Sequence, residues 1–227
     1  GEAHLFHCWT HVGGLSDRIE RIHGSVQVIQ PAYTKVLVTG PAAEPISRTE
    51  AKLHCRIDHA DEDTYVDGLI AMAREAIEAR TGLTLVTQTW KLLYDRWPEH
   101  HRYLILGRGP VTNVDHVKYT DTDGTERTWA SSNYHLDGLA NPPRLHLAWD
   151  AFWPSETLRP GKAIEVQIDC GFGNAGAVPN RIKQAMLLLI EAMYRNRGEV
   201  VLGNNASADS KRLAFGVENL LADLIQE

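Results

Sequence analysis

The sequence predicts an α+β protein, a small helical bundle core with four main helices and an inserted antiparallel β domain. Two segments with helical periodicity precede residue 83, two more follow residue 173, and short strand-like runs lie between them. A helix buries residues spaced three and four apart, whereas a half-buried strand alternates with a period of two. The expected divisions are 1–35 as an extension, 36–82 with 174–227 as the helical core, and 83–173 as the β domain.

The two helices expected before residue 83 have clear boundary signals. Ser47 and Glu50 form a Ser-x-x-Glu capping box, and the helix that they begin is expected to run to about Ile57. An acidic turn, residues 58–63, leads into the second helix, which stops at Gly82. The turn's carboxylates are interpreted as partners of the helix dipole rather than metal ligands. The apolar stripe of the second helix consists of Val66, Leu69, Ile70, Ala73 and Ile77.

The middle of the chain changes to a strand-like pattern with frequent turn residues. Asp123-Gly124 is a hairpin turn signal between two of the runs. Five tryptophans fall in this region, and we interpret them as core and rim residues of a small sheet. The alternative is a carbohydrate- or ligand-binding surface built from the same aromatic side chains. The expected strands are Gln88–Asp95, Tyr103–Leu106, Val111–Thr120, Glu126–Trp129, Tyr134–Asp137, Arg144–Leu147 and Ile164–Cys170, and the tryptophans are Trp90, Trp97, Trp129, Trp149 and Trp153.

Two helices are expected after the β region. The first runs from Asn180 to Asn196, follows Pro179, and has an apolar face wide enough to anchor a core. A segment rich in Gly, Asn and Ser, residues 199–212, is expected to be a mobile loop. The final helix has an apolar stripe that needs a partner, either the core of its own subunit or another protein. That stripe consists of Val217, Leu220, Leu221, Leu224 and Ile225.

The charge and composition restrict the function. The net charge is 23 − 29 = −6, which argues against tight non-specific binding to DNA phosphates. Three widely spaced cysteines predict a reducing compartment without a disulfide framework. The sequence contains no apolar run long enough to span a membrane and no signal-peptide pattern.

Two patterns resemble functional motifs, and neither predicts a site strongly. Gly171, Gly173 and Gly176 spell G-x-G-x-x-G, but three residues separate the last glycine from the helix and no second strand follows. We therefore expect a turn rather than a nucleotide site. Near the N-terminus, four residues of types that bind metal ions fall on one face of a possible helix. They support a further hypothesis, a small metal-dependent enzyme. These residues are His4, His7, Cys8 and His11. No nucleophile, phosphate-binding or zinc motif is found, so no catalytic, cofactor or metal residue is assigned and no enzyme activity is expected.

A series of short motifs in order resembles the head–tail connector, or adaptor, family of tailed bacteriophages and gene transfer agents. The resemblance extends from about Val36 to Ile225, and residues 1–35 lie outside it. The specificity lies in the order and spacing of the motifs. They are Pro45-Ile-Ser-x-x-Glu-Ala-Lys, Glu78-Ala-Arg-Thr-Gly82, Gln88-Thr-Trp90, Gly109-Pro-Val111, Asp121-Thr-Asp-Gly124, Gly171-Phe-Gly173, Val178-Pro179, Tyr194-Arg-Asn-Arg197 and Phe215-Gly-Val-Glu-Asn-Leu-Leu221.

The resemblance implies a structural virion protein without a catalytic site or cofactor. Such a subunit is expected in a dodecameric ring at the head–tail junction, where it joins the portal to a tail completion or stopper protein. Double-stranded DNA would pass through the lumen without specific binding. By the same resemblance the C-terminal segment is expected to reach the portal. The candidate interface residues are Arg197, Lys211, Arg212, Phe215, Val217, Leu220, Leu221, Leu224 and Ile225.

Overall fold

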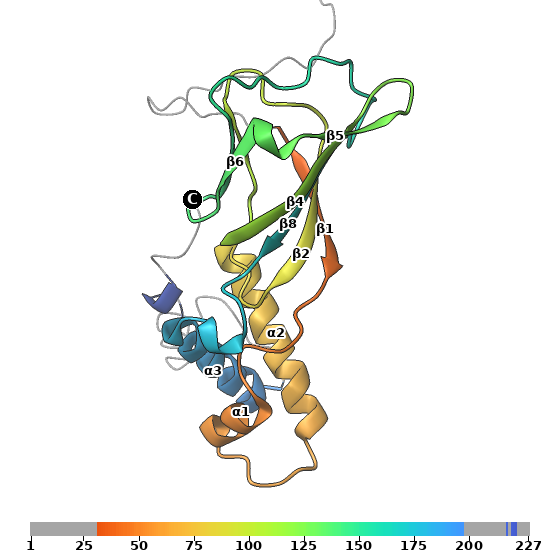
Figure 1. Ribbon diagram of the computed structural model, residues 1–227. Coiled ribbons are helices and arrows are strands. Elements are labelled where there is room, and N and C mark those ends of the chain that lie inside the picture. The colour runs from red at the N-terminus through yellow and green to blue at the C-terminus, as the bar shows by residue number, and fades with distance from the viewer. Residues whose placement is uncertain (1–30, 198–216, 218, 222–227) are drawn as a thin grey trace, which may run out of the picture. The chain divides into compact units, whose positions relative to one another are not determined.

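The computed structural model describes residues 31–197, 217 and 219–221. The chain divides into two units, residues 1–30 and residues 31–227, and all described residues belong to the second. The His4, His7, Cys8 and His11 group and the expected loop 199–212 lie outside the described residues. The described part combines helices with two antiparallel sheets, as the sequence predicts (Figure 1).

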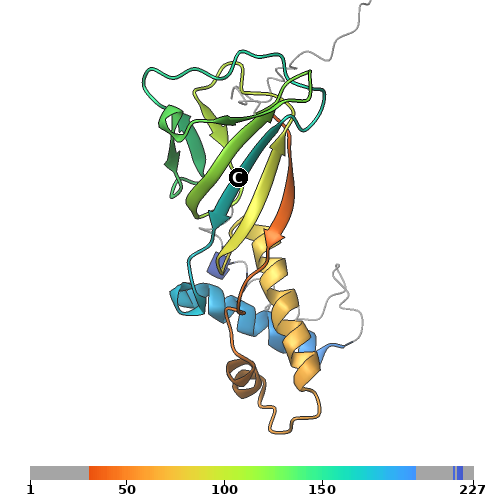
Figure 2. The same ribbon diagram turned by 45° about the vertical axis from the view of Figure 1, so that its right-hand side comes forward.

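Three α-helices gather at one end of the larger sheet (Figures 1 and 2). They are α1 (Arg48–Cys55), α2 (Asp63–Thr81) and α3 (Asn180–Arg195). The capping box at α1 is present, since the Ser47 hydroxyl accepts from the Glu50 N–H and the Glu50 carboxylate accepts from the Ser47 N–H. Gly82, with φ of 69°, ends α2 in the left-handed conformation that glycine favours.

The helical core consists of the stripes that the sequence marks. Ile70 and Ile77 of α2, Ile182 and Met186 of α3, and Ala51 of α1 are all buried in one cluster. Residues 217 and 219–221 are helical, and Leu221 belongs to the same cluster. Within the described residues the core therefore has three α-helices and this short helical piece, and the expected four-helix bundle is not confirmed.

Five strands form the larger sheet in the order β1-β2-β8-β4-β5, and three form the smaller sheet in the order β3-β7-β6. All neighbouring strands run antiparallel. Seven strands lie where the sequence predicts them to within one residue at either end. The strands are β1 (Tyr33–Thr39), β2 (Gln88–Tyr94), β3 (Tyr103–Ile105), β4 (Val111–Thr120), β5 (Glu126–Trp129), β6 (Tyr134–Asp137), β7 (Arg144–Leu147) and β8 (Ile164–Cys170).

β1 departs from the expected division of the chain. The expected division assigns the residues from 36 onward to the helical core, but the strand spans Tyr33–Thr39 and pairs with β2. The Tyr33 ring lies over Gly107, where an added Cβ would meet its hydroxyl at 1.5 Å. The structure therefore moves this segment from the helical part to the sheet. Pairing across more than fifty residues is a long-range contact that local periodicity does not encode.

The tryptophans form the core of the β region, with one exception. Trp97 is buried and its ring centroid lies 5.1 Å from that of Trp153 and 5.4 Å from that of Trp129. Trp90 is partly buried against the same cluster. Trp149, by contrast, is 91% exposed. The interpretation as core and rim residues is confirmed for four of the five.

A buried polar network joins α2 to the β region. Glu78 accepts hydrogen bonds from the Leu85 N–H at 2.9 Å and from the Gln88 amide at 3.0 Å. Its other carboxylate oxygen lies 3.3 Å from Arg74 Nη1 and 3.9 Å from Arg108 Nη1. The Arg108 guanidinium also stacks on the Trp90 ring at 4.0 Å. One carboxylate thus connects the end of α2, the linker 82–88 and the loop that follows β3.

Candidate functional site

The glycine motif is a structural turn. Gly171 has a φ of 133°, and an added Cβ would lie 2.7 Å from the backbone of Val86 and Thr87. The loop therefore crosses the 82–88 linker at a distance that only glycine permits. A short 3-10 helix, Ala175–Ala177, then separates it from α3. The turn that the sequence predicts at these glycines is confirmed, because the Gly171 backbone lies against residues 86–87.

The described cysteines are not arranged as nucleophiles. Burial raises the pKa of the Cys170 thiol to about 11, and its Sγ lies 3.2 Å from Thr84 Oγ1. Burial also raises the pKa of Cys55. A reactive cysteine needs the opposite shift, since the thiolate is the attacking form. Within the described ranges no group of three or more His, Cys, Asp and Glu could hold a metal ion, and no helix could cross a membrane.

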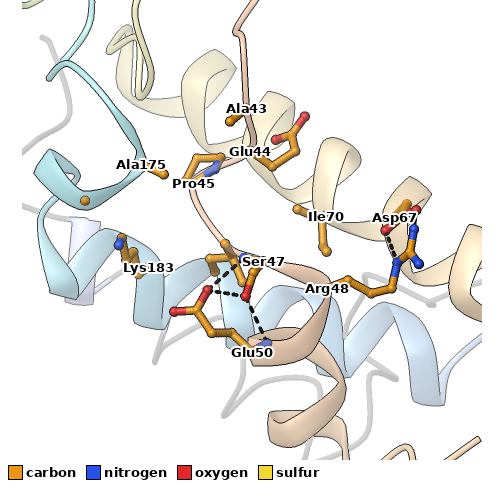
Figure 3. Close-up of a pocket in the computed structure, with 12 residues that line it drawn as sticks. Ala43, Glu44, Pro45, Ser47, Arg48, Glu50, Asp67, Ile70, Ala175 and Lys183 are labelled. Carbon is orange, nitrogen blue, oxygen red and sulfur yellow. Dashed lines mark hydrogen bonds and ion pairs between the residues drawn. The ribbon is translucent and has the colours of Figure 1, made fainter.

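A cavity of about 410 Å³ lies where the 43–48 linker, α2 and the start of α3 meet (Figure 3). Its apolar floor includes Ile46 and Ile70, both buried. Its carboxylates already have partners: the Asp67 carboxylate accepts from Arg48 Nε at 2.7 Å, and Glu50 caps α1 through Ser47. The carboxylates of Asp67 and Glu50 are therefore engaged in contacts that hold α1 to α2 and cap α1.

Arg197, a candidate interface residue, is bound to its own subunit. Its guanidinium donates to Glu62 at 2.5 Å and lies between the Tyr65 and Tyr194 rings, at 4.8 and 4.9 Å from their centroids. The Tyr194 hydroxyl donates to the same carboxylate at 2.5 Å, and this bond, with that from Arg197, lowers the pKa of Glu62. Glu62 stands at the start of α2. The cluster therefore ties the end of α3 to the start of α2, just before residue 198.

The other described candidates pack on the helical core. Leu221 is only 2% exposed, and Val217 and Leu220 are partly buried against the same cluster. The sequence predicts that the final helix reaches the portal, whereas Leu221 is buried in the core of its own subunit. The remaining candidates, Lys211, Arg212, Phe215, Leu224 and Ile225, lie outside the described residues.

Several exposed apolar residues form surfaces that the sequence analysis did not single out. Trp149 and Phe152 project from the loop after β7, whose carbonyl groups at Ala148 and Trp149 accept hydrogen bonds from Arg102 at 2.7 and 2.9 Å. The Trp153 indole also anchors this loop through the His101 carbonyl at 2.9 Å. Exposed aromatic residues on an ordered loop are typical of contact surfaces. The sequence alone does not distinguish these exposed residues from the buried tryptophans, because the difference lies in tertiary contacts.

Comparison with known proteins identifies the relationship. Residues 47–106, which run from the capping box of α1 to the end of β3, match the sequence family described as phage gp6-like head-tail connector protein. The resemblance to the head–tail connector family is confirmed. The match includes α1, α2 with Glu78, and the linker 82–88. No match is found among curated proteins.

Solved structures agree with the connector relationship over most of the fold. A chain from the neck of an empty gene transfer agent particle, computed with C6 symmetry, has a TM-score of 0.70 at 23% identity and covers 86% of this chain and 96% of that one. A chain from the virion of a native gene transfer agent particle has a TM-score of 0.69 at 24% identity, covering 85% and 95%. A chain from the native neck computed with C12 symmetry has a TM-score of 0.62 at 25% identity, covering 86% and 96%. The fold of this chain is thus similar, over most of its length, to that of chains from gene transfer agent particles.

Proposed function

We propose that this chain is the adaptor subunit of a head–tail connector ring in a phage or a phage-like gene transfer agent. It would lie at the head–tail junction of the virion and join the portal to a tail completion or stopper protein. The observation that carries the proposal is the connector-family match over α1, α2, β2 and β3. The agreement of the whole fold with gene transfer agent neck chains supports it.

Both the exposed apolar residues and the symmetry of the similar assemblies support a ring. The similar neck chains come from assemblies computed with C6 and C12 symmetry, and we propose a dodecamer. A cyclic ring requires two different complementary faces on each subunit, because every contact is heterologous. Exposed apolar residues lie on different elements, with Leu53 on α1 and Trp149 after β7. Such separated patches supply candidates for two faces.

The role in the DNA conduit is passive. With a net charge of −6 the chain lacks the cationic excess that phosphate binding needs. We expect the purified subunit to bind double-stranded DNA more weakly than micromolar at physiological salt, measured by fluorescence anisotropy. Sub-micromolar binding that weakens steeply with salt would contradict a passive lumen. A structural role also agrees with carboxylates and thiols that are paired or buried rather than free for catalysis.

Attachment to the portal is proposed for the segment after Arg197. Arg197 is held by its own subunit, and Leu221 is buried in the helical core. Lys211, Arg212, Phe215, Leu224 and Ile225 then remain as the proposed portal contacts. Leu221 itself would hold the segment rather than bind the portal.

Particle assembly tests the proposed function directly. Heads produced without this protein should accumulate without tails, and adding the wild-type chain should restore tail attachment, both counted by negative-stain electron microscopy. The Lys211→Glu and Arg212→Glu double variant should fold normally but restore attachment poorly, whereas Lys162→Glu, a matched charge reversal in the β region, should restore it. Normal tails on heads that lack the chain would refute the adaptor role.

A further inference from the structure

One edge of the five-stranded sheet is open. β1 is the first strand in the order β1-β2-β8-β4-β5, and among the described residues no strand pairs with its outer side. Every residue of β1 after Tyr33 is exposed, so neither face of the strand is covered. Val36, Leu37 and Val38 are 42%, 48% and 48% exposed. An apolar edge strand with unpaired backbone groups is a template for another strand.

The opposite edge of the sheet, formed by β5, is protected against pairing with a further strand. β5 has only four residues, and its charged side chains form ion pairs, with Lys118 Nζ 2.7 Å from Glu126 and Arg127 Nη2 3.2 Å from Asp121. Short, charged edge strands block further pairing. β1 has one charged residue, Lys35, but its ammonium donates to the Gly107 carbonyl at 3.0 Å and therefore folds back onto its own subunit.

A register shift limits the usable length of the edge. The pairing of β1 with β2 is regular from Tyr33 to Leu37 and then skips Val38 before Thr39. A bulge of this kind twists the end of an edge strand away from further pairing. The available template is therefore the five-residue stretch 33–37, which is long enough for one short added strand.

We propose that this edge accepts residues 25–30 of a second copy of the chain, as an added β-strand between neighbouring subunits of the proposed ring. The inference rests on the proposed function, because it assumes that copies assemble. Residues 25–30 end three positions before Tyr33, so a fully extended chain carries Ser25 at most roughly 27 Å from the start of β1, far enough for an adjacent subunit. Residues 25–30 read Ser-Val-Gln-Val-Ile-Gln, with valines on one side of an extended strand and isoleucine on the other.

The sequence at the start of β1 favours exchange between copies over a return within one chain. A direct hairpin would use Pro31 and Ala32 as its loop, but tight hairpin turns need positive φ, which proline cannot adopt. Donor and acceptor also lie on the same polypeptide, so each subunit supplies one strand and needs one. That stoichiometry is satisfied when copies close into a ring. Added strands gain affinity from backbone hydrogen bonds and specificity from alternate side chains.

Cross-linking between differently tagged full-length chains tests the exchange. One chain carries Val28→Cys and the other Leu37→Cys, both with Cys8→Ser and Cys55→Ser, and the mixture is treated with a short bismaleimide at a ring-forming concentration. We expect a cross-linked product that contains both tags. The control pairs Val28→Cys with Leu53→Cys, which is 80% exposed on α1 and should give at least tenfold less product.

The other outcomes overturn the inference. Equal product with the Leu53→Cys chain would indicate random collision. In a third variant that carries both Val28→Cys and Leu37→Cys, cross-links within single chains but none between chains would place the donor in its own subunit. Absence of mixed product, including from a chain that stays monomeric, would also refute strand exchange. A second measurement uses Leu37→Lys, expected to raise the concentration needed for assembly at least tenfold, against Leu53→Lys as control. Tail attachment in particles can succeed even if these tests fail, so the adaptor role is judged separately.

Discussion

The strongest test of how the two parts of the fold are joined is removal of the Glu78 carboxylate. The Glu78 side chain is 5% exposed and contacts Arg74, while its other oxygen accepts from Leu85 and Gln88. Glu78→Ala leaves Arg74 without its buried partner and the two donors without their acceptor. Breaking a buried ion pair from one side costs about 3–5 kcal/mol. In a chain of this size that corresponds to a fall in Tm on the order of 10 °C.

Glu75 supplies a matched control on the same helix. It also contacts Arg74, at 3.3 Å, but its side chain is 69% exposed. An exposed ion pair contributes roughly 0–1 kcal/mol. Glu75→Ala should therefore change stability little, although it removes the same charge from the same arginine. Glu78→Gln, which keeps the shape and one acceptor, should fall between the two alanine variants.

Urea unfolding followed by tryptophan fluorescence measures the difference. Trp90 is a suitable probe because Arg108, a neighbour of Glu78, stacks on its ring at 4.0 Å. From highest to lowest unfolding free energy, the expected order is wild type, Glu75→Ala, Glu78→Gln and Glu78→Ala. If Glu78→Ala and Glu75→Ala are equally stable, the junction does not depend on the buried carboxylate and the reasoning fails.

Three further predictions concern other parts of the molecule. Leu221→Ala should lower the unfolding free energy by about 2–5 kcal/mol, because Leu221 is buried, and the partly buried Leu220→Ala by clearly less; equal losses in urea unfolding would contradict the packing. The hydrogen bond from Arg48 lowers the pKa of Asp67. The pair therefore stabilises the fold at pH values above the unfolded pKa, which is near 3.9, and this stabilisation is lost as the pH falls through the folded pKa. Asp67→Asn should thus destabilise the protein at pH 7, and the difference from wild type should shrink as the pH falls through the folded pKa; a difference in thermal melts that stays constant with pH would refute this. Maleimide at pH 8 should leave Cys170 unmodified until the protein is denatured, because burial raises its pKa to about 11; native labelling detected by mass spectrometry would contradict it.

Local signals predicted most of the secondary structure. The Ser47 and Glu50 capping box, the glycine stop at Gly82 and the stripe through Ile182 and Met186 depend on residues within one or two turns of a helix. The strands from β2 to β8 were predicted for the same reason, since alternation and turn residues are local. The connector resemblance added the order of these elements, which no single motif carries.

The parts that could not be predicted depend on contacts between distant segments. Nothing near β1 indicates that it pairs with β2, and nothing near Glu78 indicates that its carboxylate is buried between two arginines. Arg197 was predicted as a candidate interface residue, whereas it binds Glu62 and Tyr65 at the start of another helix of its own subunit. Candidate interface residues are hardest of all, because exposure to a partner and burial in the own core give the same apolar stripe.

The position of β1 changes how the β region should be viewed. A simple insertion between residues 83 and 173 could be removed by joining α2 to α3. In the structure, however, β1 enters the sheet from before α1, so removal of 83–173 would leave its apolar residues without β2. The segments 39–48, 82–88 and 170–180 thus connect the sheet to the helices, and the Glu78 network and the Gly171 crossing lie on two of them. A load applied to the sheet would therefore reach the helices through these buried contacts, as the proposed adaptor role requires.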